Sequence, residues 1–224
     1  MTDKPKWQPI SSVIDCTTEE GLAKGIAAAA EAVRRGQLVV MPTDTVYGLG
    51  ADAFSPDAVT AILTAKGRGR EMPPPVLVPS AQTLDGLATN VPAYARDLIE
   101  AFWPGPLTVV LVAQSSLMWD LGETNGTVGL RMPKDDTALK LLDEVGPMAV
   151  TSANLSGQAP AQTVLVASAQ LGIAVSVYLD AGPCEGSLPS TILDCTGAAP
   201  VILRAGALSV ARVQEILGDV ELRN

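Results

Sequence analysis

Apolar residues in the first half of the chain follow helical spacing in some stretches and form short continuous runs in others. Residues 19–36 follow Thr18, begin with two glutamates and stop at a glycine, which predicts a helix with both of its ends marked. The run QLVVM at 37–41 predicts a buried strand. Residues 55–66 predict a second helix, because Ser55 can cap it and Pro56 occupies its first turn.

The same two patterns continue to the end of the chain. Further strands are expected at 74–79, 107–113, 126–133, 147–152, 174–180, 190–195 and 200–206, and further helices after Ser80 and at 92–103, 135–145 and 210–218. Several strand pairs are joined too briefly for a crossover helix, so antiparallel and parallel pairs must share one sheet. We therefore expect an α/β fold of the α+β type, a single three-layer domain on a twisted mixed sheet at 16–220, preceded by a flexible tail at 1–15.

Composition supports a self-sufficient core. Of the 224 residues, 47% are hydrophobic and only 17% are charged, so the fold need not depend on disulfides or metals. The net charge of −9 argues against a broad surface for nucleic-acid phosphates, which clustered Lys and Arg would have to supply. A local basic pocket remains compatible with that charge.

The cysteine and histidine content limits the kinds of catalytic and metal sites that the protein can contain. Cys16, Cys184 and Cys195 are widely spaced and form no CxxC motif, which suits a reducing cytoplasm better than a disulfide framework or a zinc site. There is no histidine, so the usual general base near neutral pH is missing. The N-terminus lacks the apolar stretch of a signal peptide, and the run at 107–113 is too short for a bilayer, so we expect a soluble cytoplasmic protein without membrane contact.

Four segments rich in small polar residues are candidates for a ligand site. They are PTDTVYGLG at 42–50, KGRGREMP at 66–73, TSANLSG at 151–157 and GPCEGSLPST at 182–191. Ligands of open α/β sheets bind beyond the strand ends, so the four segments are expected to meet around one cleft. The alternative for the first and third segments is a purely structural turn.

Cations gather in and around these segments. Lys66, Arg68 and Arg70 lie within five residues, which suits an anionic ligand such as a phosphate chain, although they could instead neutralise a helix C-terminus. Arg131 and Arg204 each end an apolar strand. A charge there needs a partner, either an internal carboxylate or a ligand anion. None of the nucleotide-binding glycine fingerprints is present.

Taken in order, seven short blocks resemble the YrdC/Sua5 family of threonylcarbamoyl-adenylate synthases. The blocks are Pro42 to Gly50, Lys66 to Arg68, Pro104-Gly105, Arg131 to Pro133, Ser152 to Gly157, Ser190-Thr191 and Arg204 to Gly206. The resemblance runs from about residue 20 to 210. It implies a YrdC-like fold in the short, single-domain form of the family.

The resemblance also implies a reaction. L-threonine, bicarbonate and ATP give threonylcarbamoyl-AMP and pyrophosphate, with Mg²⁺ carried by the ATP phosphates and no metal held by the protein. The product serves the t6A modification of tRNA position 37 through a threonylcarbamoyl transferase complex, and a weak direct contact with tRNA is left open.

By the same resemblance, individual residues acquire roles. Lys66 and Arg68 are expected to be catalytic; threonine and bicarbonate are expected at Thr43, Tyr47, Arg131 and Ser190; the nucleotide is expected at Lys66, Thr127, Ser152, Asn154 and Arg204. Arg70 adds a charge to the family pattern, and we expect it at the nucleotide because it lies beside Lys66 and Arg68. The chain departs from the family pattern at Gly69, where proline is more usual, and at Met72, where many relatives are polar.

Two other functions fit the same residues. One is a non-catalytic RNA-binding module of the YrdC type, which the overall acidity disfavours. The other is a YciO-like paralogue that acts on another substrate, because side chains of unknown position decide substrate identity.

Overall fold

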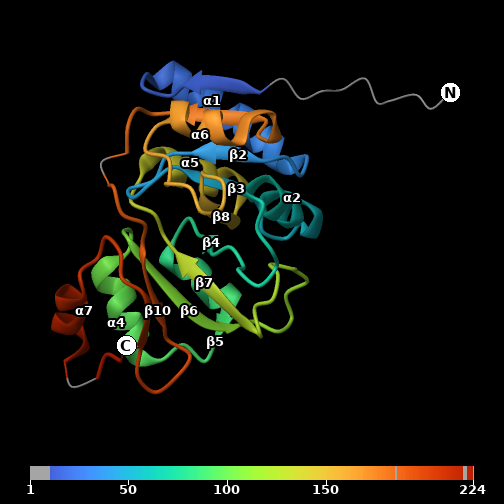
Figure 1. The fold of residues 1–224 in the computed structure, drawn as a ribbon. Helices are drawn as coiled ribbons and strands as arrows, with labels where there is room; N and C mark the ends of the chain where they lie inside the picture. Colours follow the sequence, from blue (N-terminus) through green and yellow to red (C-terminus); the bar gives the residue numbers. More distant parts are fainter. Residues whose placement is uncertain (1–10, 185, 219–220, 224) are drawn as a thin grey trace.

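One mixed sheet organises the chain, as the computed structural model of residues 11–184, 186–218 and 221–223 shows (Figure 1). Its strands are β1 (Ser12–Asp15), β2 (Val39–Met41), β3 (Gly48–Asp52), β4 (Val76–Leu77), β5 (Ala88–Thr89), β6 (Leu107–Ala113), β7 (Thr127–Arg131), β8 (Met148–Ser152), β9 (Val177–Asp180), β10 (Thr191–Asp194) and β11 (Val201–Arg204). They are ordered β1-β9-β2-β3-β8-β4-β7-β6-β10-β11, and β5 pairs with β6. The pairs β2–β3, β3–β8 and β6–β7 are antiparallel, whereas β1–β9, β4–β7 and β6–β10 are parallel.

Side-chain caps fix the beginnings of most of the longer helices. The helices are α1 (Glu19–Arg34), α2 (Pro56–Lys66), α3 (Leu84–Leu87), α4 (Ala93–Phe102), α5 (Asp136–Val145), α6 (Val164–Leu171) and α7 (Val210–Leu217), with 3-10 turns η1 (Ala81–Thr83) and η2 (Gly172–Ala174). Thr18 accepts from the amide of Gly21 at the start of α1, and Ser55 accepts from that of Ala58 at the start of α2. These are the caps that the sequence indicates.

Helices cover both faces of the sheet. Successive strand residues point to opposite faces, so Val39 and Met41 pack with α1 and α5, whereas Val40 belongs to a second core with α2, α4, α6 and α7. The expected α/β domain with three layers and a twisted mixed sheet is therefore confirmed (Figure 1). Among the described residues, no helix is long and apolar enough to cross a membrane.

Several elements differ from the expectation. Ser12–Asp15 form β1, paired in parallel with β9, so the last part of the expected tail at 1–15 is ordered by the sheet; residues 1–10 of that tail lie outside the described residues. Residues 48–52 form β3, although the sequence predicts a loop as far as Gly50. Glycine lets β3 approach β8 closely, since a Cβ on Gly48 would lie 2.7 Å from Val150 Cγ1. The sequence reading also missed α6.

The sheet register brings the polar segments together. Gly48, the first residue of β3, pairs with Ser152, the last residue of β8, so the segment before β3 and the segment after β8 lie at the same end of these two strands. Thr191, the first residue of β10, pairs with Leu107, the first residue of β6. The segment before β10 therefore lies beside the beginning of β6.

Candidate functional site

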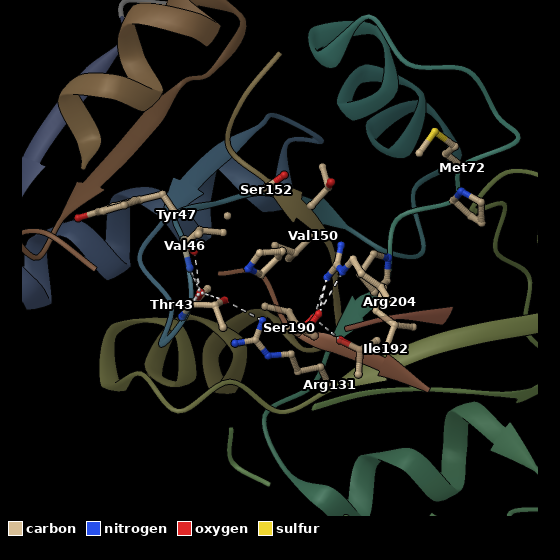
Figure 2. Close-up of a pocket in the computed structure, with 18 of the residues that line it drawn as sticks. Thr43, Val46, Tyr47, Met72, Arg131, Val150, Ser152, Ser190, Ile192 and Arg204 are labelled. Carbon is tan, nitrogen blue, oxygen red and sulfur yellow. Dashed lines mark hydrogen bonds between the residues drawn. The ribbon is translucent and has the colours of Figure 1, made fainter. Parts of the chain in front are cut away.

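A cavity of about 240 Å³ lies where the four polar segments meet (Figure 2). It is lined by Thr43, Thr45, Val46, Tyr47, Gly48, Arg68, Met72, Pro73, Pro75, Leu77, Thr108, Arg131, Val150, Thr151, Ser152, Pro189, Ser190, Ile192 and Arg204. Each of the four segments contributes lining residues, as the sequence predicts. One wall is apolar, and the remaining walls carry hydroxyls and guanidinium groups.

The hydroxyl of Thr43 closes the turn between β2 and β3. It donates to the carbonyl oxygen of Val46 at 2.6 Å and accepts from the amides of Thr45 and Val46 at 3.2 and 3.3 Å. The segment is thus a hydrogen-bonded turn that also lines the cavity. The Thr43 hydroxyl already has three backbone partners.

Tyr47 is fully buried, and its hydroxyl points away from the cavity in Figure 2. The hydroxyl donates to the carbonyl oxygen of Gly182 at 2.6 Å and accepts from the amide of Ala181 at 3.3 Å. Burial raises the pKa of Tyr47, so the phenol stays neutral. Only the body of the side chain, on the β2–β3 side, lines the cavity.

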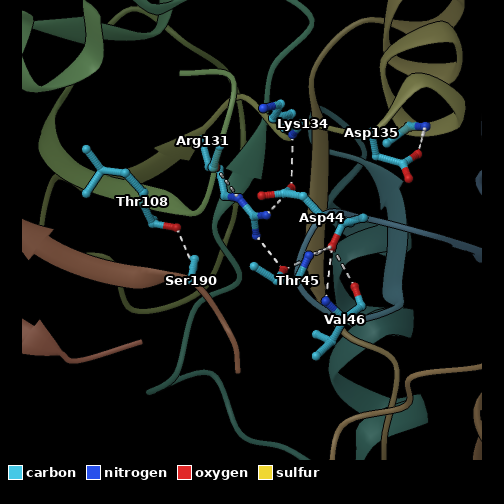
Figure 3. A network of polar contacts seen from close by, with 12 residues as sticks. Asp44, Thr45, Val46, Thr108, Arg131, Lys134, Asp135 and Ser190 are labelled. Atoms are coloured by element: carbon cyan, nitrogen blue, oxygen red, sulfur yellow. Dashed lines mark hydrogen bonds and ion pairs between the residues drawn. The ribbon is translucent and has the colours of Figure 1, made fainter. Parts of the chain in front are cut away.

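Arg131 pairs with an internal carboxylate. Its Nη2 lies 2.5 Å from Asp44 Oδ1, its Nη1 donates to Thr45 Oγ1 at 3.1 Å, and its Nε donates to the carbonyl of Gly105 at 3.0 Å (Figure 3). Burial lowers the pKa of Arg131, and the charge of Asp44 opposes that shift. The internal salt bridge that the sequence left open as an alternative is present, and the same side chain lines the cavity.

Arg204 is held by a backbone oxygen instead. Its Nε and Nη2 donate to the carbonyl oxygen of Ser190 at 3.1 and 2.7 Å, and the Ser190 hydroxyl lies 2.8 Å from Thr108 Oγ1. Burial lowers the pKa of Arg204, and the charges of Arg131 and Arg68 lower it further. No ion pair joins Arg204 to a carboxylate within the described residues.

Arg68 faces the cavity with spare hydrogen-bonding capacity. Its Nη1 donates to Thr151 Oγ1 at 3.2 Å, while its buried Nε has no partner among the residues that the structure describes. Burial lowers the pKa of Arg68. A buried donor without an acceptor is costly, so this guanidinium is suited to an anion that enters the cavity.

Lys66 does not line the cavity. Only 3% of the residue is exposed, and its Nζ donates to the carbonyl oxygens of Ser152 at 2.5 Å and Asn154 at 2.7 Å. The Asn154 amide nitrogen in turn donates to the carbonyls of Leu155 and Gln158, both at 2.8 Å. Lys66 and Asn154 thus hold the loop after β8, whereas Ser152 reaches the cavity.

Two other expected nucleotide ligands also lie away from the cavity lining. Arg70 is half-exposed and forms an ion pair with Asp120 at 2.6 Å. The hydroxyl of Thr127 donates to the carbonyl oxygen of Thr124 at 2.7 Å. Both residues lie near the family's blocks in sequence, but the backbone turns their side chains elsewhere.

Sequence reasoning missed some residues of the site. Asp44 and Thr45 lie inside a recognised segment, but their bonds to Arg131 could not be foreseen, since the residues are almost ninety positions apart. Thr108 did give a signal, because it is a hydroxyl inside the apolar run at 107–113. No group of three acidic or cysteine side chains suited to a metal occurs in the part of the chain that the structure describes.

Comparison with protein families and curated relatives gives matches across this region. The Sua5/YciO/YrdC family model, described as "Telomere recombination", matches residues 31–206. A Mycobacterium leprae protein with a provisional assignment as threonylcarbamoyl-AMP synthase is 57% identical over 211 residues, covering 94% of this chain and 96% of its own. The threonylcarbamoyl-AMP synthase of Bacillus subtilis is 37% identical over 201 residues, 88% of this chain and 58% of the relative.

Solved structures have the same fold. Pyrococcus abyssi Sua5 in complex with L-threonine matches with a TM-score of 0.89 and 34% identity over 95% of this chain, which spans 63% of the Pyrococcus chain. Escherichia coli YciO matches with a TM-score of 0.82 and 26% identity, over 91% of this chain and 100% of its own.

Proposed function

The chain belongs to the Sua5/YciO/YrdC family, and we propose that it is an L-threonylcarbamoyladenylate synthase. It makes threonylcarbamoyl-AMP and pyrophosphate from L-threonine, bicarbonate and ATP. The observation that carries the proposal is the set of three guanidinium groups, from Arg68, Arg131 and Arg204, on one small cavity of a chain whose net charge is −9. Among the described residues, carboxylates neutralise only the guanidinium group of Arg131.

The chemistry needs little from a protein base. The amine of threonine attacks the carbon of bicarbonate and gives a carbamate with loss of water; if CO₂ derived from bicarbonate reacts instead, the amine loses one proton. A carbamate oxygen then attacks the α-phosphorus of ATP, and the bond to the pyrophosphate oxygen breaks. Negative charge accumulates on phosphate oxygens, so positioned cations and hydrogen-bond donors supply most of the catalysis.

The cavity suggests a division of roles. Arg68 and Arg204 contact the phosphates, because neither guanidinium is neutralised by a carboxylate within the described residues. Ser152 and Ser190 lie beside them and bind the nucleotide or the carbamate. Threonine lies against the β2–β3 turn, with Thr43 and the aliphatic side chain of Val46 near its hydroxyl and methyl groups.

Three residues act without contacting the substrates. Lys66 positions the loop that presents Ser152, because its ammonium group is bonded to two carbonyl oxygens of that loop. Asn154 closes the same loop. Asp44 orients Arg131, which borders the bicarbonate region from a fixed position.

Magnesium enters with ATP. The donors present suit this, since the described residues that line the cavity contribute hydroxyls and guanidinium groups but no carboxylate. Mg²⁺ bound to the phosphates neutralises part of their charge and favours departure of pyrophosphate. The protein's own residues bind the remaining phosphate oxygens.

The adenylate passes to a threonylcarbamoyl transferase complex that modifies tRNA position 37 to t6A in the cytoplasm. Any direct contact of this chain with tRNA is weak, because its net charge of −9 opposes binding of a polyanion. The same charge disfavours the non-catalytic RNA-binding module. A YciO-like paralogue with another substrate has less support, since identity to YciO is 26% against 57% for the Mycobacterium leprae relative.

The test is incubation with ATP, Mg²⁺, bicarbonate and each of several labelled amino acids, followed by chromatography of the nucleotide products. We expect a labelled adenylate and pyrophosphate that require both threonine and bicarbonate. No product with any amino acid would support the RNA-binding alternative. Product with a different amine would support the paralogue.

A further inference from the structure

The segment that carries Arg68 has few attachments of its own. After α2 ends, the amide of Arg68 donates to the carbonyl of Leu63 at 2.9 Å. The next backbone bond to another part of the chain is made by the carbonyl of Arg70, which accepts from the amide of Glu123 at 2.8 Å. Met72, at the end of this segment, lines the same cavity as Arg68. The position of Arg68 and Met72 at the cavity therefore depends on the part of the chain that contains Glu123.

Glu123 belongs to residues 114–126, the loop between β6 and β7, which is firmly anchored. Leu121 is 2% exposed and packs into the main core. The ring of Trp119 stacks on that of Phe54, with centroids 5.5 Å apart, at the junction of β3 and α2. At the C-terminal end of the loop, the hydroxyl of Thr127 donates a hydrogen bond to the carbonyl oxygen of Thr124. This loop has fixed attachments on two sides.

Two contacts besides the Glu123 amide join the loop to the Arg68 segment. Arg70 forms its ion pair with Asp120, whose carboxylate also accepts from the amide of Gly122 at 3.1 Å and so shapes the turn. Gly122 has a φ of +108°, and a Cβ there would lie 2.7 Å from the carbonyl oxygen of Arg70. Only glycine fits both the conformation and the close approach.

We propose that the 114–126 loop is a brace that positions Arg68 and Met72, and that Asp120 and Gly122 are positioning residues for the anion that Arg68 binds. The proposal rests on the proposed function, which makes that anion the phosphate chain of ATP. It accounts for Arg70 and Thr127, two residues that are expected at the nucleotide from the sequence. They belong to the brace and its anchor, and they act on the nucleotide through Arg68.

The experiment compares Gly122→Ala and Asp120→Asn with a matched control. Asp85→Asn breaks the ion pair between Asp85 and Arg96, which is 2.8 Å long and as exposed as the pair between Asp120 and Arg70. For Gly122→Ala we expect the KM for ATP to rise at least about tenfold, because displacement of a binding group by about 1 Å is costly. Asp120→Asn should raise it about twofold to fivefold, as an exposed ion pair allows. The KM for threonine, kcat and the control variant should change little.

Hydrogen exchange provides a readout that does not depend on ATP. Gly122→Ala should speed exchange of peptides that span residues 66–73 and 119–126, while Asp85→Asn leaves them unchanged. Unchanged exchange in Gly122→Ala, or an equal rise in KM for ATP and threonine, would overturn the brace.

The two proposals fail in different ways. If the unaltered protein makes no adenylate, the proposed function is wrong, and the exchange data alone decide whether the loop holds the Arg68 segment. If the unaltered protein is active and Gly122→Ala has the same KM for ATP, the brace is wrong and the proposed function stands.

Discussion

The ammonium group of Lys66 lies 2.5 Å from the carbonyl oxygen of Ser152 and 2.7 Å from that of Asn154. A lysine at the end of α2 thus holds the loop after β8, although the two elements are more than eighty residues apart. This contact links the fold to the cavity, since Ser152 is one of its lining residues.

Lys66→Ala should lower the rate of adenylate formation at least about a hundredfold, because the loop that presents Ser152 loses its anchor and a misplacement of about 1 Å can cost that much. The contacts also predict a loss of stability of about 1–3 kcal/mol, because two buried carbonyl oxygens lose their donor. Initial rates and urea unfolding measure the two effects. Lys66→Met keeps most of the side-chain volume, so it is the control for the void that alanine would leave at this position. Near-normal turnover in a stable Lys66→Ala variant would remove Lys66 from the site.

Lys66 should also make stability depend on pH. Burial and the nearby charge of Arg68 lower the pKa of Lys66 from 10.5 to about 8. Between these values the unfolded chain holds more protons at this position than the folded chain, so the free energy of unfolding rises with pH. From pH 7.5 to 9.5 the rise should be about 1–2 kcal/mol from this group. Lys66→Met should lack this part of the rise, and an identical pH slope in both proteins would refute the shift.

Arg68→Ala should lower the rate about a hundredfold without lowering the melting temperature, because the folded protein leaves the buried Nε without a partner. Arg96→Ala, which removes an exposed guanidinium paired with Asp85, is the control. ATP affinity measured by calorimetry should fall in Arg68→Ala only. A large drop in melting temperature would mean that Arg68 is structural instead.

Threonine should be preferred over serine by about fivefold, since a methyl group in an apolar pocket contributes roughly 1 kcal/mol. Both Val46 and Leu49 are aliphatic in the turn segment, but Leu49 is fully buried in the core and only Val46 lines the cavity. Val46→Ala should reduce the preference to about twofold, measured as the ratio of kcat/KM values for the two amino acids. If the ratio stayed at its original value, threonine would bind elsewhere in the cavity.

Tyr47→Phe should affect folding more than catalysis. The hydroxyl is bonded to Gly182 and Ala181 and points away from the cavity, so its removal costs about 1 kcal/mol of stability. The KM for threonine should stay within about twofold of the original, because the ring remains in place. Thermal unfolding and steady-state rates provide the comparison. A tenfold rise in that KM would restore a direct role for the phenol.

The sequence by itself determined most of the elements and the composition of the site. Its capped helices and apolar runs are physically local signals, so α1, α2, α5, β2, β6 and β8 were predictable. The four polar segments were also visible, since small hydroxyl residues and glycines interrupt the apolar pattern. By contrast, β1 has only four residues, whose burial alternates, so its strand pattern in the sequence is weak. The helix α6 has no charged residue in its first turn to mark its beginning.

Only the tertiary structure decided what each side chain contacts. Lys66, Arg68 and Arg70 are nearly adjacent in sequence, yet the first holds a loop, the second faces the cavity and the third joins Asp120. The end of α2 at Gly67, in the left-handed conformation, turns the chain and separates these directions. Their acceptors lie 50 to 88 residues away, and spacing along the chain contains no information on such partners. Charge and residue type predict a site for an anion, whereas packing determines which of these cations faces the cavity.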